Sequence, residues 1–199
     1  MLAFFNKVIK RIAPNRRSMW LRELYPQYQI GRGTYGSTLI IYDWGEGATL
    51  RIGAFCSIAL NVKILLGGEH RSDWVTTYPF NVLWEAGKEF NGHPRTKGDV
   101  HIGNDVWVGT EAVIMSGINI GDGAVLGART VVARDIPPYA VAVGNPARII
   151  KKRFDDKTIQ RLLKVKWWNW EDDRIQKALP LLLNPDLRSF LQAAEMNEI

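Results

Sequence analysis

Three histidines are the residues of this 199-residue sequence whose chemistry best suits proton transfer near neutral pH. His70 and His93 lie in a stretch rich in aromatic residues, and His101 directly precedes an aliphatic position of a repeat. The single cysteine, Cys56, excludes an intramolecular disulfide, and neither a CxxC redox pair nor zinc-ligand spacing occurs. A general base and a thiol nucleophile are therefore the two chemistries to weigh.

A six-residue repeat determines where these residues lie. Bulky aliphatic residues recur at a constant step of six, and a mostly small or aliphatic residue follows four positions after each. The first set is Ile102, Val108, Ile114, Ile120, Leu126 and Val132, and the second is Val106, Ala112, Ile118, Ala124, Thr130 and Ile136. A step of six suits short strands that meet at triangular corners, and it does not match the 3.6-residue period of a helix. The pattern predicts a mainly β fold wound as a coil.

The repeat is interrupted once. An earlier run of the same pattern consists of Ile52, Ile58 and Ile64. Because the 38 residues from Ile64 to Ile102 are not a multiple of six, the segment of about 67–98 must leave the coil as an extruded loop. Long loops in compact proteins often carry function, and two of the three histidines lie in this one. Cys56 takes a small interior position of the coil, so we expect it to pack there and not to carry an acyl group.

Two further segments flank the coil. Residues 1–29 are expected to be helical or irregular, residues 30–150 to form the coil with its loop, and residues 151–199 to form a C-terminal helical cap. In residues 1–13, apolar residues share one helical face that lysine and arginine interrupt. Such a helix can lie on an anionic membrane, but packing on the rest of the protein is favoured. Without an apolar run of about 18 residues or a signal-peptide pattern, and with one cysteine, a cytoplasmic location is expected.

Seven motifs occur in order along residues 50–183. They are 52–58 (IGAFCSI), His70 followed by 77–80 (TYPF), 97–99 (KGD), 102–109 (IGNDVWVG), 144–147 (GNPA), 152–154 (KRF) and 167–170 (WWNW). Together they resemble the hexapeptide-repeat acetyltransferases, specifically the xenobiotic acetyltransferase branch, which includes streptogramin and hexapeptide-type chloramphenicol acetyltransferases. The resemblance implies a left-handed parallel β-helix, a homotrimer with active sites between subunits, and acetyl-CoA as donor.

The resemblance also places the catalytic base at His70. Transfer of an acetyl group from a thioester to a hydroxyl needs a base that takes the hydroxyl proton during attack. The expected enzyme is an acetyl-CoA-dependent O-acetyltransferase that works by direct attack in a ternary complex. Glu69 and Asp73 are candidates to orient the ring of His70. His93 and His101 are expected to be structural.

Basic residues gather where the repeat ends. Between residues 129 and 153, six basic residues and one acidic residue give +5 of the net charge of +6. Coenzyme A carries a pyrophosphate and a 3′-phosphate, which such a cluster suits. By analogy with the family, the pantetheine arm runs along the edge of the coil. The residues expected to bind acetyl-CoA are Trp107, Gly109, Ala128, Arg129, Arg134, Pro146, Arg148, Lys151 and Arg153. A nucleic-acid partner is not expected, because a broad basic stripe with interleaved aromatic residues is lacking.

Four aromatic residues are candidates to line the pocket of a small-molecule acceptor. They are Tyr35, Trp44, Tyr78 and Phe80. The segment 35–49 is shorter than in antibiotic-modifying members of the family, which slightly favours a sugar or nucleotide-sugar of a surface glycan as the hydroxyl acceptor. The alternatives are an antibiotic, chloramphenicol or streptogramin A, and an amino sugar that is acetylated on nitrogen.

Two alternatives come from other classes of protein. A β-helix carbonic anhydrase would need three zinc-ligating histidines, and His70, His93 and His101 do not have that spacing. No metal is therefore expected. A non-catalytic β-helix binding protein is the other alternative, and an assay for acetyl transfer distinguishes it from an enzyme.

Overall fold

The computed structural model describes residues 19–36 and 38–199. The basic amphipathic segment expected over residues 1–13 lies outside the described residues. The chain forms two compact units, Met1–Lys151 and Lys152–Ile199. The first unit contains the repeat and the extruded loop, and the second contains the C-terminal helices.

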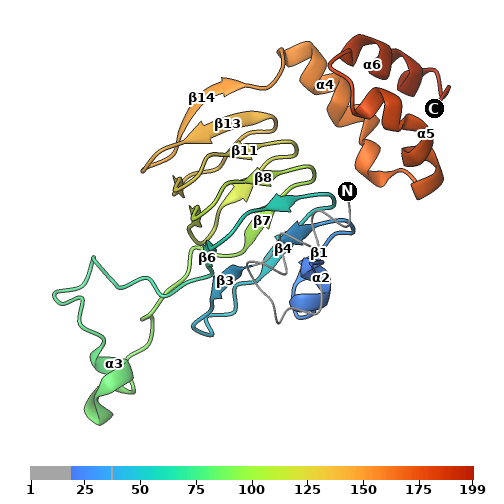
Figure 1. Ribbon diagram of the computed structural model, residues 1–199. Helices are drawn as coiled ribbons and strands as arrows, with labels where there is room; N and C mark the ends of the chain where they lie inside the picture. The colour runs from blue at the N-terminus through green and yellow to red at the C-terminus, as the bar shows by residue number, and fades with distance from the viewer. Residues whose placement is uncertain (1–18, 37) are drawn as a thin grey trace. The chain divides into compact units, whose positions relative to one another are not determined.

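Short strands of the first unit wind into three sheets (Figure 1). The first sheet contains β1 (Gln29–Ile30), β4 (Leu50–Ile52), β7 (Val100–Ile102) and β10 (Asn119–Ile120). The second contains β2 (Tyr35–Gly36), β5 (Ser57–Ile58), β8 (Trp107–Val108), β11 (Val125–Leu126), β13 (Ala140–Val143) and β14 (Arg148–Lys152). The third contains β3 (Leu39–Tyr42), β6 (Val62–Leu65), β9 (Val113–Ile114) and β12 (Val131–Val132). Most hydrogen-bonded neighbours are parallel and three strands apart in the chain, so each turn of the coil adds one strand to every sheet.

The repeat positions fill the interior of this coil. Ile64, Val108, Ile114, Leu126 and Val132 are fully buried, and the other large aliphatic members of the repeat expose at most 3% of their surface. The second set of repeat positions, from Val106 to Ile136, exposes at most 5%. Cys56 is a free cysteine and is fully buried among them. The interior column predicted from the step of six is confirmed.

One corner of the coil repeats a left-handed backbone conformation in successive turns. The residues there are Gly33, Phe55, Asp105, Gly123 and Tyr139, with φ between 55° and 69°. The backbone N–H of Phe55 donates to Arg32 at 2.9 Å, and that of Tyr139 donates to Asp122 at 2.8 Å, so the corners stack through main-chain hydrogen bonds. A Cβ atom on Gly33 would lie 2.6 Å from the ring of Phe55, and one on Gly123 would lie 2.5 Å from the ring of Tyr139. Each ring therefore occupies space that the glycine of the neighbouring turn leaves open.

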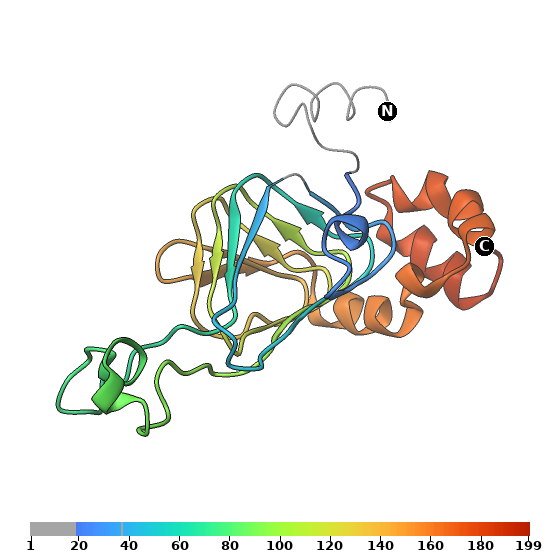
Figure 2. The ribbon, with the colours of Figure 1, turned by 90° about the horizontal axis from the view of Figure 1, so that it is seen from below.

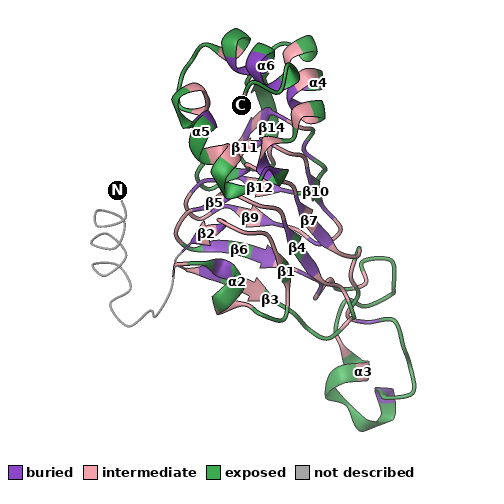
Figure 3. Cartoon of the chain, turned by 90° about the vertical axis from the view of Figure 1, so that its right-hand side faces the viewer, coloured by how far each residue is buried: buried purple, intermediate pink, exposed green. Residues whose placement is uncertain are grey.

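Between β6 and β7 the chain leaves the coil as the extruded loop, residues 66–99. It projects away from the three sheets in two perpendicular views (Figures 1 and 2). Its regular structure consists of the short helix α3 (Phe80–Leu83) and the 3-10 helix η1 (Glu85–Gly87). Most of its residues are exposed, whereas every strand of the coil except β1 and β14 carries at least one buried residue (Figure 3). The loop predicted from the break in the repeat is confirmed.

Helices make up the second unit. They are α4 (Asp156–Val165), η2 (Trp167–Asn169), α5 (Asp172–Leu182) and α6 (Leu187–Glu195). A short helix of the first unit, α2 (Leu21–Leu24), precedes the coil. Asp155 caps α4, because its carboxylate accepts a hydrogen bond from the N–H of Thr158 at 3.0 Å. Trp168 and Trp170 are buried, so these tryptophans of the 167–170 motif pack inside the protein. That these helices cap the coil stays a prediction. None of the helices in the described residues is long and apolar enough to cross a membrane.

Candidate active site

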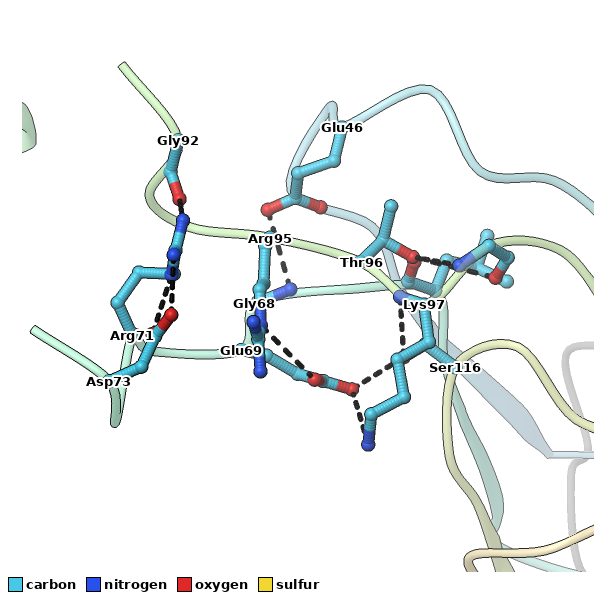
Figure 4. Close-up of polar contacts among 12 residues, drawn as sticks. Glu46, Gly68, Glu69, Arg71, Asp73, Gly92, Arg95, Thr96, Lys97 and Ser116 are labelled. Atoms are coloured by element: carbon cyan, nitrogen blue, oxygen red, sulfur yellow. Dashed lines mark hydrogen bonds and ion pairs between the residues drawn. The ribbon is translucent and has the colours of Figure 1, made fainter. Parts of the chain in front are cut away.

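The stretch of the extruded loop before α3 and the stretch after η1 form its two arms. The two arms pair at the base of the loop, next to the coil (Figure 4). The N–H of Glu69 donates to the carbonyl of Arg95, and the N–H of Arg95 donates to the carbonyl of Glu69, both at 3.0 Å. Farther out, Nη1 of Arg71 donates to the carbonyl of Gly92 at 3.3 Å. His70 lies on one arm between these contacts, and His93 lies on the other. The pairing of the arms therefore brings the two histidines together.

A backbone carbonyl fixes the ring of His70. Its Nδ1 lies 2.8 Å from the carbonyl oxygen of Thr77. Because a carbonyl only accepts hydrogen bonds, Nδ1 must carry the proton, and the lone pair of the neutral ring then lies on Nε2. The side chain is exposed, so Nε2 can be reached by a substrate. This is the tautomer that a general base acting through Nε2 needs.

The carboxylate of Glu69 does not orient His70 but ties the loop to the coil. It accepts a hydrogen bond from the hydroxyl of Ser116 at 2.6 Å, and Ser116 lies between β9 and β10 of the coil. It also pairs with Lys97 at 3.4 Å and with Arg95 at 3.9 Å. Since Glu69 directly precedes His70, this contact anchors the backbone that carries the candidate base.

Asp73 does not orient His70 either. Both of its carboxylate oxygens accept hydrogen bonds from Arg71, at 2.7 and 2.6 Å, and these bonds lower the pKa of Asp73 well below its ordinary value. Neither carboxylate that the sequence offered as an orienting group is therefore bonded to the ring. The orienting role of Thr77 could not be predicted from the sequence, because the carbonyl of any residue on the arm could have reached Nδ1.

Aromatic side chains of the loop enclose a pocket of about 350 Å³. Its lining consists of Trp74, Thr76, Tyr78, Phe80, Asn81, Phe90 and Asn91. The rings of Tyr78 and Phe80, both predicted to line the acceptor pocket, lie 4.8 Å apart between centroids. Trp74 and Phe90 were not among the predicted acceptor residues, although their place in the aromatic loop was a signal. The lining suits the flat apolar part of a small molecule.

A larger groove, of about 930 Å³, follows the outer face of the first sheet from Gln29 to Pro138. The only histidine among its lining residues is His101, whose Nε2 lies 3.7 Å from a carboxylate oxygen of Asp99. The lining residues, all within the described part of the chain, include no phenylalanine, tyrosine or tryptophan. The groove therefore has a histidine without such rings, whereas the loop pocket has an aromatic lining and belongs to the same loop as His70.

The other two predicted acceptor residues come from the coil. Trp44 follows β3 and covers the start of the loop, because a Cβ atom on Gly68 would lie 2.7 Å from its ring. Tyr35 lies in the second sheet, in the same ladder as Ser57 and Trp107. The loop, however, leaves the third sheet and returns to the first. Within one chain, Trp44 therefore lies at the start of the loop. Tyr35 lies with Trp107 on the second sheet, which the loop neither leaves nor rejoins.

Three residues predicted to hold the pantetheine arm lie along the second sheet. Trp107 is 57% exposed on β8, and Gly109 follows that strand. A Cβ atom on Gly109 would lie 2.6 Å from the backbone nitrogen of Ala128, which follows β11. The structure thus brings Trp107, Gly109 and Ala128 together on one edge.

The basic residues are less uniform than the sequence suggested. Nε of Arg129 pairs with Glu111 at 2.8 Å, which partly neutralises that guanidinium. Arg134 is exposed after β12, and Arg148 and Lys151 are exposed on β14. Arg153 belongs to the second unit, where its guanidinium lies 5.3 Å from the ring centroid of Phe154. Pro146 lies in the turn between β13 and β14, and its peptide bond to Asn145 is cis.

Comparison with known proteins shows the family. The profile of the bacterial transferase hexapeptide family (six repeats) matches residues 99–134. A chloramphenicol acetyltransferase of Agrobacterium fabrum is 49% identical over 144 residues, which cover 69% of this chain and 68% of the relative. This chain belongs to the hexapeptide-repeat acetyltransferases. Within them, a chloramphenicol acetyltransferase of Klebsiella aerogenes is 44% identical over 178 residues (81% of this chain, 85% of the relative), and a virginiamycin A acetyltransferase of Staphylococcus aureus is 38% identical over 168 residues (82% and 76%).

A solved structure supports the same fold. The crystal structure of a hexapeptide-repeat-containing acetyltransferase from Vibrio cholerae matches this acetyltransferase with a TM-score of 0.53 and 24% identity, over 75% of this chain and 89% of that one. The predicted left-handed parallel β-helix is therefore confirmed. The similar acetyltransferases described above confirm the enzyme class and the resemblance to the xenobiotic branch.

Proposed function

We propose that this hexapeptide-repeat acetyltransferase moves the acetyl group of acetyl-CoA to a hydroxyl of a small antibiotic of the chloramphenicol or streptogramin A type, with His70 as general base. The observation that carries the proposal is the hydrogen bond from Nδ1 of His70 to the carbonyl of Thr77 at 2.8 Å, which leaves Nε2 free on an aromatic loop. The names of the relatives, two chloramphenicol and one virginiamycin A acetyltransferase, support the acceptor.

The chemistry follows from the free nitrogen of His70. Nε2 accepts the hydroxyl proton of the acceptor while the hydroxyl oxygen attacks the thioester carbonyl. A tetrahedral oxyanion forms, the carbon–sulfur bond breaks, and the acetyl group stays on the acceptor oxygen. The proton then passes from Nε2 to the departing sulfur, which leaves as the free thiol. This direct transfer uses neither a metal nor an acyl-enzyme.

Cys56 offers no competing nucleophile in this scheme. Burial raises the pKa of its thiol to about 12, so the reactive thiolate is scarce at neutral pH. Its sulfur also lies 3.0 Å from the carbonyl oxygen of Gly103, inside the coil. The packing role expected from the repeat fits both observations.

Acetyl-CoA would bind along the second sheet. Trp107 offers an exposed ring beside Gly109 and Ala128 for the pantetheine arm, and Pro146 lies in a neighbouring turn of the chain. The phosphates would be held by the basic residues around the end of the repeat. These are Arg129, Arg134, Arg148, Lys151 and Arg153.

A homotrimer would complete the site. His70 lies on a loop that joins the third and first sheets, whereas Tyr35 and Trp107 lie on the second sheet. We propose that the loop of one subunit meets the second sheet of its neighbour, so that acceptor and donor are held at the same place. This separation supports the site between subunits that the resemblance to the family implies.

A sugar hydroxyl is the second candidate acceptor, because the short segment 35–49 favours it. A thiol-release assay with acetyl-CoA compares chloramphenicol, streptogramin A, a nucleotide-linked sugar and an amino sugar. We expect turnover with at least one antibiotic. Turnover only with the nucleotide-linked sugar would replace the antibiotic by a glycan precursor, and turnover only with the amino sugar would indicate N-acetylation. Failure to release thiol with every acceptor would favour a non-catalytic binding protein.

A further inference from the structure

His93 packs directly on the candidate base. The ring centroids of His70 and His93 are 4.5 Å apart, and the ring planes are inclined by 80°, which is an edge-to-face contact. We propose that His93 is a positioning residue whose neutral ring fixes the orientation of His70. The proposal rests on the function proposed for His70 and replaces the purely structural role expected for His93 from the sequence.

The environment of His93 leaves its ring little room to move. Its exposed fraction is 7%, whereas His70 is exposed. The indole of Trp74 lies at 6.3 Å from the imidazole of His93, with the guanidinium of Arg71 stacked 4.9 Å from the same indole. His93 therefore has an aromatic neighbour besides His70.

The backbone of His93 is held as firmly as its ring. The side-chain amide of Asn81 donates to the carbonyl of His93 at 2.6 Å. The adjacent carbonyl, that of Gly92, accepts from Arg71 on the opposite arm at 3.3 Å. Together with the paired arms at Glu69 and Arg95, these contacts fix the distance between the two histidines.

The charge state of His93 suits this role. Neither ring nitrogen has a hydrogen-bond partner among the described residues, so an imidazolium there would be desolvated without compensation. Burial first, and then the neighbouring His70, lower the pKa of His93 below its ordinary value. A neutral ring does not repel His70 when His70 takes a proton. Because the nitrogens of His93 are unbonded, a phenyl ring should replace its imidazole with little loss.

The test compares His93→Ala, which removes the ring, with His93→Phe, which keeps an aromatic ring. His101→Ala serves as the matched control, because His101 is a histidine of the coil. We expect His93→Ala to lower kcat about tenfold or more with KM for acetyl-CoA unchanged, since a small misplacement of a reacting group is costly. We expect His93→Phe to stay within about threefold of the wild type and His101→Ala to match it.

NMR spectroscopy tests the orientation of the His70 ring independently of the activity assay. ¹⁵N NMR of labelled histidines should show His70 as the Nδ1–H tautomer in the wild type and in His93→Phe, and as a mixture of tautomers in His93→Ala. Should His93→Ala fail to fold by circular dichroism, His93→Gln, which lacks a ring, takes its place with the same expectations.

Two results would overturn the proposal. One is a His93→Ala protein that keeps both its kcat and the single tautomer of His70. The other is a His93→Phe protein that loses as much activity as His93→Ala while His70 keeps its tautomer. If the wild type releases no thiol with any acceptor, the proposed function fails, but the tautomer spectra still decide whether His93 positions His70.

Discussion

The coil and the extruded loop differ in burial and in the regularity of their sequence. Coil residues such as Ile114 and Leu126 are fully buried, and each turn repeats the contacts of the turn before it. Loop residues such as Trp84 and Phe90 are 57% and 60% exposed, and no two stretches of the loop are alike. A repeat offers many equivalent positions, whereas a general base needs one position unlike all others. The candidate chemistry therefore lies where the repeat is interrupted.

Because the candidate base lies in the loop and the buried core lies in the coil, we expect substitutions in the two regions to lower activity and stability separately. Removal of the base from the loop should give the largest effect on activity. His70→Ala should lower kcat about 10²–10⁴-fold, because a general base contributes on that order. Thermal unfolding should stay as in the wild type, since the ring of His70 is exposed. A His70→Ala enzyme with normal turnover would show that the base lies elsewhere.

A core substitution in the coil should have the opposite signature. Leu126→Ala should lower the free energy of unfolding by about 2–5 kcal/mol, because it leaves a cavity at a fully buried position. Leu83→Ala in the loop is the matched control, and at 61% exposure it should change stability by less than about 0.5 kcal/mol. Urea unfolding of both variants at one protein concentration measures the difference. Equal losses in the two variants would contradict the separation.

The junction between the two regions should show an intermediate effect. Glu69→Gln weakens the contact between the loop and Ser116 of the coil, and we expect kcat to fall about tenfold through misplacement of the adjacent His70. Ser116→Ala should act in the same direction, and the double variant should be little worse than Glu69→Gln alone, because both substitutions act on the same hydrogen bond. Glu85→Gln, an exposed carboxylate of the loop, is the control and should be neutral. Full additivity of the two losses would show that the contact is not what places His70.

The smallest effect on activity is expected inside the coil. Cys56→Ala should leave kcat within about twofold, because the raised pKa of about 12 keeps the thiol protonated at pH 8, where the enzyme would be assayed. For the same reason, iodoacetamide should label Cys56 only after unfolding, which mass spectrometry can follow. Loss of activity in Cys56→Ala with unchanged stability would revive the idea of an acyl-cysteine.

The coil could be predicted almost residue by residue, because the six-residue repeat shows which position of each six lies in the interior. The same repeat located the loop, since Ile64 and Ile102 do not belong to one register. It could not reveal the partner of His70, because Thr77 acts through its carbonyl, which every residue has. It also could not reveal that His93 packs on His70, since that contact depends on how two irregular arms pair.

The paired arms at Glu69 and Arg95 have a consequence for how this enzyme could change. Two hydrogen bonds close the loop at its base. The fold of the coil therefore depends on the ends of the loop meeting, and not on the residues between those ends. Doubling the length of such a closed segment costs only about 0.6 kcal/mol in chain entropy. A different insert with the same ends could therefore be exchanged into the scaffold at little cost, and with it the choice of molecule that is acetylated.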